Sequence, residues 1–120
     1  MKNTINSNLI AANSFLSTCQ DVLSKDQVIE YVEKASARIN DELDMFIGPF
    51  DIENFIKQYD NIVGVDMHEK DIFLRGSNDI HVLIATIRKT LPKEVKLILD
   101  QTGRELMVEE TQKVLSKNNN

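Results

Sequence analysis

Hydrophobic positions near the start of the chain recur at steps of three and four. The residues of this stripe are Leu9, Ala12, Leu16, Cys19 and Leu23. Such spacing places side chains on one face of a helix, so we expect a helix from about residue 8 to 23. Ser7 and Asn8 precede the stripe and are candidates for its N-cap.

A second apolar stripe follows directly and is the clearest helical signal in the chain. Ser24 precedes Gln27 by three residues, which is the spacing of a capping box, and Asp26 suits the positive end of the helix dipole. The stripe consists of Val28, Val32, Ala35, Ile39, Leu43 and Phe46. Gly48 followed by Pro49 is expected to end this helix.

A short third helix comes next, and then the period of the pattern changes. Asp51 can cap a helix whose shared face is formed by Ile52, Phe55, Ile56 and Tyr59. From residue 62, apolar residues alternate with others up to Met67, and the apolar run 72–74 resumes after a polar turn at 68–71. This change of period predicts a β-hairpin.

The remaining pattern predicts one more helix and one more hairpin. The apolar face of that helix is formed by Ile80, Leu83, Ile84, Ile87 and Leu91. Pro92 ends it, because proline cannot continue a helix. Alternation from Val95 to Leu99, a turn at 101–103 and a return strand over 106–108 indicate the second hairpin.

Together these elements predict an α+β fold, in which N-terminal helices precede a hairpin, a helix and a hairpin. We expect a mostly antiparallel four-stranded sheet with helices packed on one face. The chain of 120 residues fits one domain, placed at residues 1–115, with a disordered polar tail over 116–120. The first helix packs either on this domain or on a second copy, so a homodimer through the N-terminal helices is one expectation.

Composition narrows the class of protein. A content of 42% hydrophobic and 28% charged residues is typical of a globular chain. The sequence contains no run of about 18 apolar residues, the length that a membrane-spanning helix needs. Cys19 is the only cysteine, so an intramolecular disulfide is excluded and a cytoplasmic location is favoured. The mildly apolar stretch 9–16 also leaves a lipoprotein signal ending at Cys19 as an alternative, although Asn13 interrupts it.

Charge is distributed unevenly along the chain. The net charge is −5, and residues 21–71 hold thirteen acidic against five basic side chains, whereas residues 72–104 hold three against six. An acidic total disfavours nucleic-acid binding. A local basic edge is still available to Arg75, Arg88, Lys89, Lys93, Lys96 and Arg104. We expect no nucleic-acid partner and no membrane partner.

The acidic residues at the end of the second helix are the main candidates for partner binding. Asp41, Glu42 and Asp44 lie where negative charge opposes the helix dipole, while Asp51 and Glu53 surround the next helix start. Phe50 follows Pro49 and is a candidate apolar anchor. An acidic patch of this kind attracts a basic partner, and the alternative is a solvated face that keeps the protein soluble.

Metal binding and catalysis have weaker signals. Ligand-type residues gather in one short region: Asp66, His68, Asp71, Asp79 and His81. Their spacing matches no established metal motif, and no glycine-rich loop accompanies a nucleophile. We therefore expect no metal, no cofactor and no enzyme activity, with a metal-binding or hydrolytic enzyme using His68 and His81 as the alternative.

The function expected from these features is that of a small acidic protein-binding module. Compact acidic domains of this size act as cognate inhibitors or immunity-type proteins, which neutralise a basic partner such as a bacterial toxin by occlusion. This expectation rests on charge and on analogy at the level of the fold. A dimeric secretion-chaperone-like protein is the alternative within the binding class.

Overall fold

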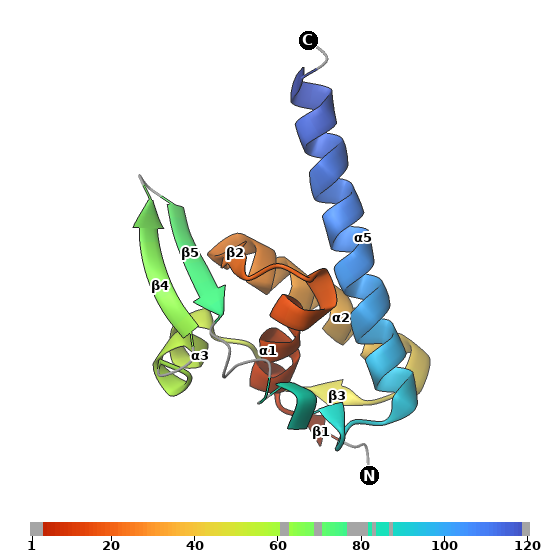
Figure 1. Ribbon diagram of the computed structural model, residues 1–120. Coiled ribbons are helices and arrows are strands. Elements are labelled where there is room, and N and C mark those ends of the chain that lie inside the picture. The colour runs from red at the N-terminus through yellow and green to blue at the C-terminus, as the bar shows by residue number, and fades with distance from the viewer. Residues whose placement is uncertain are drawn as a thin grey trace.

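The computed structural model (Figure 1) describes residues 4–60, 63–68, 71–76, 82, 84–86 and 88–118. The elements along the chain are β1 (Thr4–Ile5), α1 (Ser7–Thr18), β2 (Val22–Ser24), α2 (Lys25–Leu43), β3 (Phe46–Ile47), α3 (Ile52–Gln58), β4 (Val63–His68), β5 (Asp71–Gly76) and α5 (Lys93–Asn118). Residues 82, 84–86 and 88 are also helical and lie in the helix predicted before Pro92. Residues 77–81, 83 and 87 of that prediction lie outside the described residues.

α1 forms the centre of the core and packs against both α2 and α5 of its own chain (Figure 1). Its apolar side chains are buried almost completely, including Ile10 and Phe15. The polar residues within it are satisfied locally, since Ser14 donates to the Ala11 carbonyl at 2.6 Å and Asn13 donates to the Leu9 carbonyl at 3.2 Å. The first helix therefore packs on this domain, one of the two arrangements expected for it.

α1 ends at Thr18, five residues before the predicted end. Cys19 adopts a left-handed conformation with a φ of 58°, and its N–H donates to the Leu16 carbonyl, so the chain turns there. Leu23 is buried as predicted, but it belongs to the strand β2. Lipoprotein cleavage before Cys19 would remove α1, around which the core is built.

The structure confirms the capping box and most of the buried stripe that the sequence predicts for α2. The Gln27 N–H donates to Ser24 Oγ, and the Ser24 N–H donates to Gln27 Oε1 at 2.8 Å. The side chains of Val28, Val32, Ala35 and Ile39 are buried. The helix ends at Leu43, because Asp44 takes a left-handed C-cap conformation, and Phe46 is instead exposed in β3.

The first predicted hairpin is confirmed, whereas the four-stranded sheet is wrong. β4 pairs antiparallel with β5, with Val65 opposite Leu74. β2 adds to the other side of β5 and completes a three-stranded antiparallel sheet in the order β2–β5–β4. β1 and β3 form a separate parallel pair of two residues each.

The second predicted hairpin is wrong, because residues 93–118 form the single helix α5. Its buried residues follow a helical spacing: Val95, Ile98, Leu99, Thr102 and Leu106. Leu97, which the alternating pattern placed with Val95 and Leu99, is 59% exposed. Residues 116–118, placed in a disordered tail by their polar composition, are the last residues of α5.

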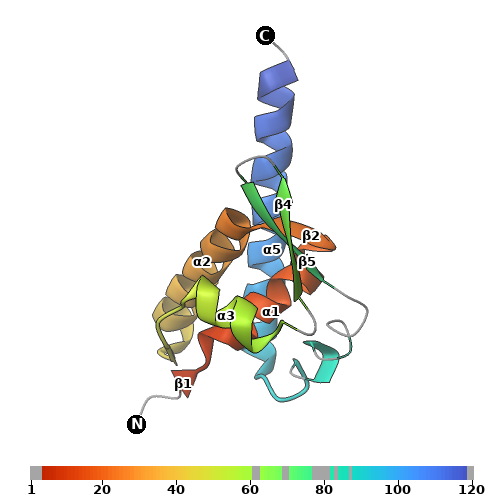
Figure 2. The same cartoon turned by 90° about the vertical axis from the view of Figure 1, so that its left-hand side faces the viewer.

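α5 gives the molecule its elongated shape. The principal extents are 51 × 32 × 23 Å, and the C-terminal half of α5 projects beyond the other elements in both views (Figures 1 and 2). Residues 111–116 are all exposed. In the part of the chain that the structure describes, no helix is long and apolar enough to span a membrane.

Candidate functional site

The outward side of α2 carries exposed acidic side chains. Glu33 and Asp41 are exposed on this side, Glu42 is exposed at the end of the helix, and none of the three forms an ion pair with another described residue. Glu33 lies two helical turns before Asp41, so both residues belong to the same side of the helix.

The basic residues of α2 are neutralised within the molecule. Lys25 pairs with Glu53 of α3, and Arg38 pairs with Glu105 of α5. Lys34 contacts Glu30 at 3.2 Å and Glu109 at 2.9 Å. The hydrogen bond to Glu109 raises the pKa of the Lys34 ammonium group above its usual value. The hydrogen bond from Arg38 lowers the pKa of the Glu105 carboxyl. These contacts leave the unpaired carboxylates to determine the field at the α2 surface.

The structure divides the predicted partner-binding residues into two groups. Asp41, Glu42 and Asp44 lie together at the end of α2, and we call them the acidic end. Glu53 pairs with Lys25 at the other end of the same helix. Because a helix rises about 1.5 Å per residue, these two ends are about 24 Å apart. The predicted single patch is therefore divided, because the acidic end lies at one end of α2 and Glu53 is neutralised by Lys25 at the other.

Two of the predicted residues also have structural roles. Asp51 is the N-cap of α3, where its Oδ1 accepts hydrogen bonds from the Glu53 N–H at 3.0 Å and the Asn54 N–H at 3.4 Å. Asp44 is the left-handed C-cap of α2, and its N–H donates to the Asn40 carbonyl at 3.1 Å. Local backbone requirements thus explain part of the acidic character that the sequence shows here.

A hollow of about 370 Å³ lies beside α2, between the Lys25–Glu53 ion pair and the acidic end. We call it the acidic hollow, and its lining residues are Ile29, Glu33, Phe50, Asp51 and Ile52. The segment after β3 returns along α2 and brings Phe50 and Asp51 next to Glu33. Two carboxylates and three apolar side chains therefore line one hollow.

Phe50 is half-buried within this hollow. Its ring centroid lies 6.0 Å from that of Phe55, a fully buried residue of α3, and the rings are tilted by 54°. This contact fixes the ring while leaving part of it accessible, as an apolar contact surface requires. Glu33 was missed by the sequence prediction, since its proximity to Phe50 and Asp51 depends on the path of the chain after β3.

A polar network crosses the core where α1, α2 and α5 meet. The Tyr31 hydroxyl donates its proton to the Leu99 carbonyl at 3.2 Å, and its oxygen lies within hydrogen-bond distance of the Ser17 hydroxyl at 3.0 Å. Arg88 donates two hydrogen bonds to Asp100, each at 3.0 Å, and a third to Asn13 Oδ1 at 3.0 Å. Burial raises the pKa of the Tyr31 hydroxyl well above its ordinary value. The network links distant segments, and its tyrosine stays protonated.

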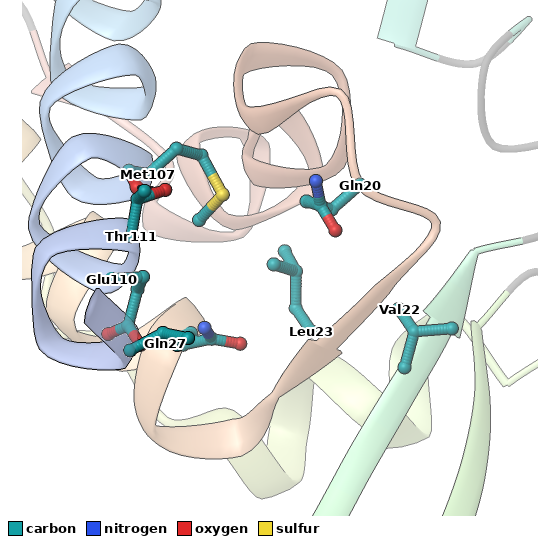
Figure 3. Close-up of a pocket in the computed structure, with 8 residues that line it drawn as sticks. Gln20, Val22, Leu23, Gln27, Met107, Glu110 and Thr111 are labelled. Atoms are coloured by element: carbon teal, nitrogen blue, oxygen red, sulfur yellow. Dashed lines mark hydrogen bonds between the residues drawn. The ribbon is translucent and has the colours of Figure 1, made fainter. Parts of the chain in front are cut away.

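A second hollow is a groove of about 340 Å³ between β2 and the projecting part of α5 (Figure 3). Met107 from α5 and Leu23 from β2 point into it from opposite sides. Its polar lining consists of Gln20, Gln27, Glu110 and Thr111. This set contains no cationic group that would hold an anionic ligand.

Of the predicted metal residues, Asp66 is the one whose side chain the structure describes. The side chains of His68 and Asp71, and the whole of residues Asp79 and His81, lie outside the described residues. Within the described residues, no three His, Cys, Asp or Glu side chains are grouped closely enough to hold a metal.

The predicted basic edge is divided by ion pairs. Arg75 pairs with Asp66 at 2.9 Å on the hairpin, and Arg88 is held by Asp100. The other basic residues remain along α5 without an ion pair among the described residues: Lys93, Lys96 and Arg104. The edge is thus reduced to the first half of α5 and Lys89.

Comparisons with protein-family models, with curated proteins and with solved structures found no match. The chemistry of the described surfaces is therefore the basis for assigning a function.

Proposed function

We propose that this chain is a protein-binding module that holds a basic partner at the acidic hollow and the acidic end of α2. The observation that carries the proposal is that Glu33 and Asp51 line the same hollow as the apolar side chains of Ile29, Phe50 and Ile52. The partner we expect is a protein with a basic surface, such as a bacterial toxin, and binding would neutralise it by covering that surface.

The hollow suits a long basic side chain. Lysine and arginine combine an apolar stem with a cationic head, so the stem would pack on Ile29, Phe50 and Ile52. The head would then lie beside the carboxylates of Glu33 and Asp51. An arginine guanidinium can in addition stack on the accessible part of the Phe50 ring.

The acidic end supports association over a longer range. Asp41 and Glu42 are exposed and unpaired among the described residues, and the net charge of the chain is −5. Charges at the rim of an interface mainly raise the association rate, because they steer a partner of opposite charge. We expect this steering to weaken with added salt, since exposed charges are screened within about 10 Å at 0.1 M ionic strength.

A cytoplasmic location and the lack of enzyme activity belong to the same proposal. The lone Cys19 is exposed and unpaired, which suits a reducing compartment. Occlusion of a partner requires a stable surface and no chemical reaction. The polar side chains of the core network suit this role, because they hydrogen-bond to one another.

The test is affinity capture with a pair of charge-matched variants. The full chain, immobilised, is incubated with an extract of the organism that encodes it at about 0.1 M salt, where charge attraction persists. The test variant is Glu33→Gln/Asp51→Asn, because asparagine keeps the N-cap of α3 while removing its charge. The control is Asp60→Asn/Glu94→Gln, which removes two negative charges at other exposed positions.

We expect wild type and control to retain the same basic protein and the test variant to bind it at least about tenfold more weakly. Adding the purified chain to that protein should then suppress its own activity. Equal retention by wild type and the test variant would contradict the proposed site.

A further inference from the structure

The first half of α5 carries a surface opposite in charge to α2. Lys93, Lys96 and Arg104 surround Leu97, and we call these four residues the basic face. At 100° per residue all four lie on one side of the helix. The charges of Lys93, Lys96 and Arg104 are not paired among the described residues, and Asp100 between them is held by Arg88 at 3.0 Å.

Leu97 is the apolar centre of the basic face. It is 59% exposed, although leucine is usually buried, and positive side chains lie on both sides of it along the helix. An apolar centre with a charged rim is the arrangement that protein interfaces use. The acidic hollow has the complementary composition, with apolar lining residues beside Glu33 and Asp51.

We propose that a second copy of this chain docks its basic face onto the acidic hollow and the outward side of α2. Charge complementarity identifies this occupant: positive residues around an apolar side chain meet negative residues around an apolar hollow. Within one molecule the two surfaces cannot meet, because α5 packs on α2 through other residues, including Arg38 with Glu105 and Lys34 with Glu109.

The contact joins two different surfaces, so each copy can bind one neighbour at α2 and another at α5. Self-association is then head-to-tail and increases with concentration. For its acidic half this inference rests on the proposed function. It adds that a second copy competes with the basic partner for the same hollow, so partner binding should dissociate the self-associated form.

The experiment is sedimentation velocity on the full chain from about 5 to 500 μM, the range in which weak contacts are populated. One variant, Lys93→Glu/Lys96→Glu, reverses the basic face, and glutamate in the first turns of α5 is favoured by the helix dipole. The other, Glu33→Lys/Asp41→Lys, reverses the outward side of α2, and lysine near a helix end at position 41 is also favoured. The control is Lys57→Glu/Lys113→Glu, which changes the net charge as the first variant does.

We expect the sedimentation coefficient of wild type and control to rise with concentration, and each reversed variant alone to raise the apparent Kd at least about tenfold. A mixture of the two reversed variants should associate again, because the unchanged α2 surface of the first variant can bind the unchanged basic face of the second. A wild type that stays monomeric, or reversed variants that associate as wild type does, would overturn the inference.

Failure of the proposed function gives a different pattern. Lys93→Glu/Lys96→Glu leaves the acidic hollow intact, so it should still capture the basic partner. Capture that depends on Glu33 and Asp51 together with a monomeric wild type would reject self-association alone. Self-association that depends on Glu33, without any captured partner, would reject the proposed function alone.

Discussion

Gly103 allows two helices to pack closely, because it has a hydrogen atom where other residues have a side chain. It lies within α5, and a Cβ built at this position would come within 2.4 Å of the Ser17 carbonyl oxygen of α1. Backbone atoms cannot move aside as a flexible side chain can. The close approach of α1 and α5 therefore requires glycine here.

Replacing Gly103 by alanine should destabilise the fold, although alanine is favoured over glycine by about 1 kcal/mol in an exposed helix. We expect Gly103→Ala to lower the free energy of unfolding by about 1 to 3 kcal/mol, the usual cost of overpacking a core. Urea denaturation measures the change. Gly64→Ala is the control, because nothing lies within 4 Å of a Cβ there, and a stability of Gly103→Ala at or above wild type would refute the steric requirement.

Tyr31 should make stability fall at alkaline pH. Burial raises its pKa in the folded chain above the ordinary value of 10.0, so above pH 10 the unfolded chain releases this proton while the folded chain keeps it. The free energy of unfolding then decreases as pH rises, by about 1 kcal/mol at pH 11.

The matched variant is Tyr31→Phe, which loses the bonds to Ser17 and Leu99 and about 1 kcal/mol at pH 8. Between pH 8 and pH 11 the free energy of unfolding of Tyr31→Phe should fall less than that of wild type, because only wild type has this hydroxyl. Other groups with raised pKa values, Tyr59 and Lys34, are present in both chains and cancel. Parallel pH profiles in urea denaturation would be inconsistent with this prediction.

At the scale of elements, local pattern predicts α2 and the β4–β5 hairpin but not α5. α2 has a capping box at one end and an uninterrupted apolar stripe, so its local signals agree with one another. The residues from Val95 to Leu99 fit both a strand and a helix, because short apolar runs do not distinguish these periods. The helix is selected by contacts with α1 and α2, in which Ile98 and Thr102 are buried.

The candidate site also has one part that the local sequence predicts and one part that it does not. Asp41, Glu42 and Asp44 are neighbours in the sequence and lie on one helix end, so their grouping could be predicted. The acidic hollow joins Glu33 to Asp51, which are eighteen positions apart, through the return of the chain after β3. The pattern of apolar residues does not indicate the direction in which the chain turns after β3.

The capping box of α2 can be tested as a unit. Ser24→Ala removes the acceptor for the Gln27 N–H, and we expect the free energy of unfolding to fall by about 1 kcal/mol. Ser24→Asp keeps a capping oxygen and adds a charge that the N-terminal dipole favours, so it should retain most of the stability. Equal losses for both variants in thermal or urea denaturation would show that the cap contributes little.

At the scale of the whole molecule, opposite charges lie on separate helices. α2 presents unpaired carboxylates while the first half of α5 presents unpaired cations among the described residues, and ion pairs join the two helices between these surfaces. Added salt affects the two kinds of charge contact unequally. Screening weakens the attraction between exposed charges and a partner more than it weakens the partly buried ion pair of Arg88 and Asp100. Binding should thus change at salt concentrations that leave the fold intact.

The central position of α1 has a consequence for the time course of synthesis. α1 leaves the ribosome before α5, which packs against it, and the bonds that join distant segments span 83 residues from Ser17 to Asp100 and 75 from Asn13 to Arg88. Until α5 has been translated, Ile10 and Phe15 lack part of their cover, so the nascent chain cannot complete its core. Contacts this distant along the chain also slow folding after release. A chain interrupted before α5 would keep α1 accessible to proteases and chaperones, so the synthesis of α5 decides whether α1 is protected.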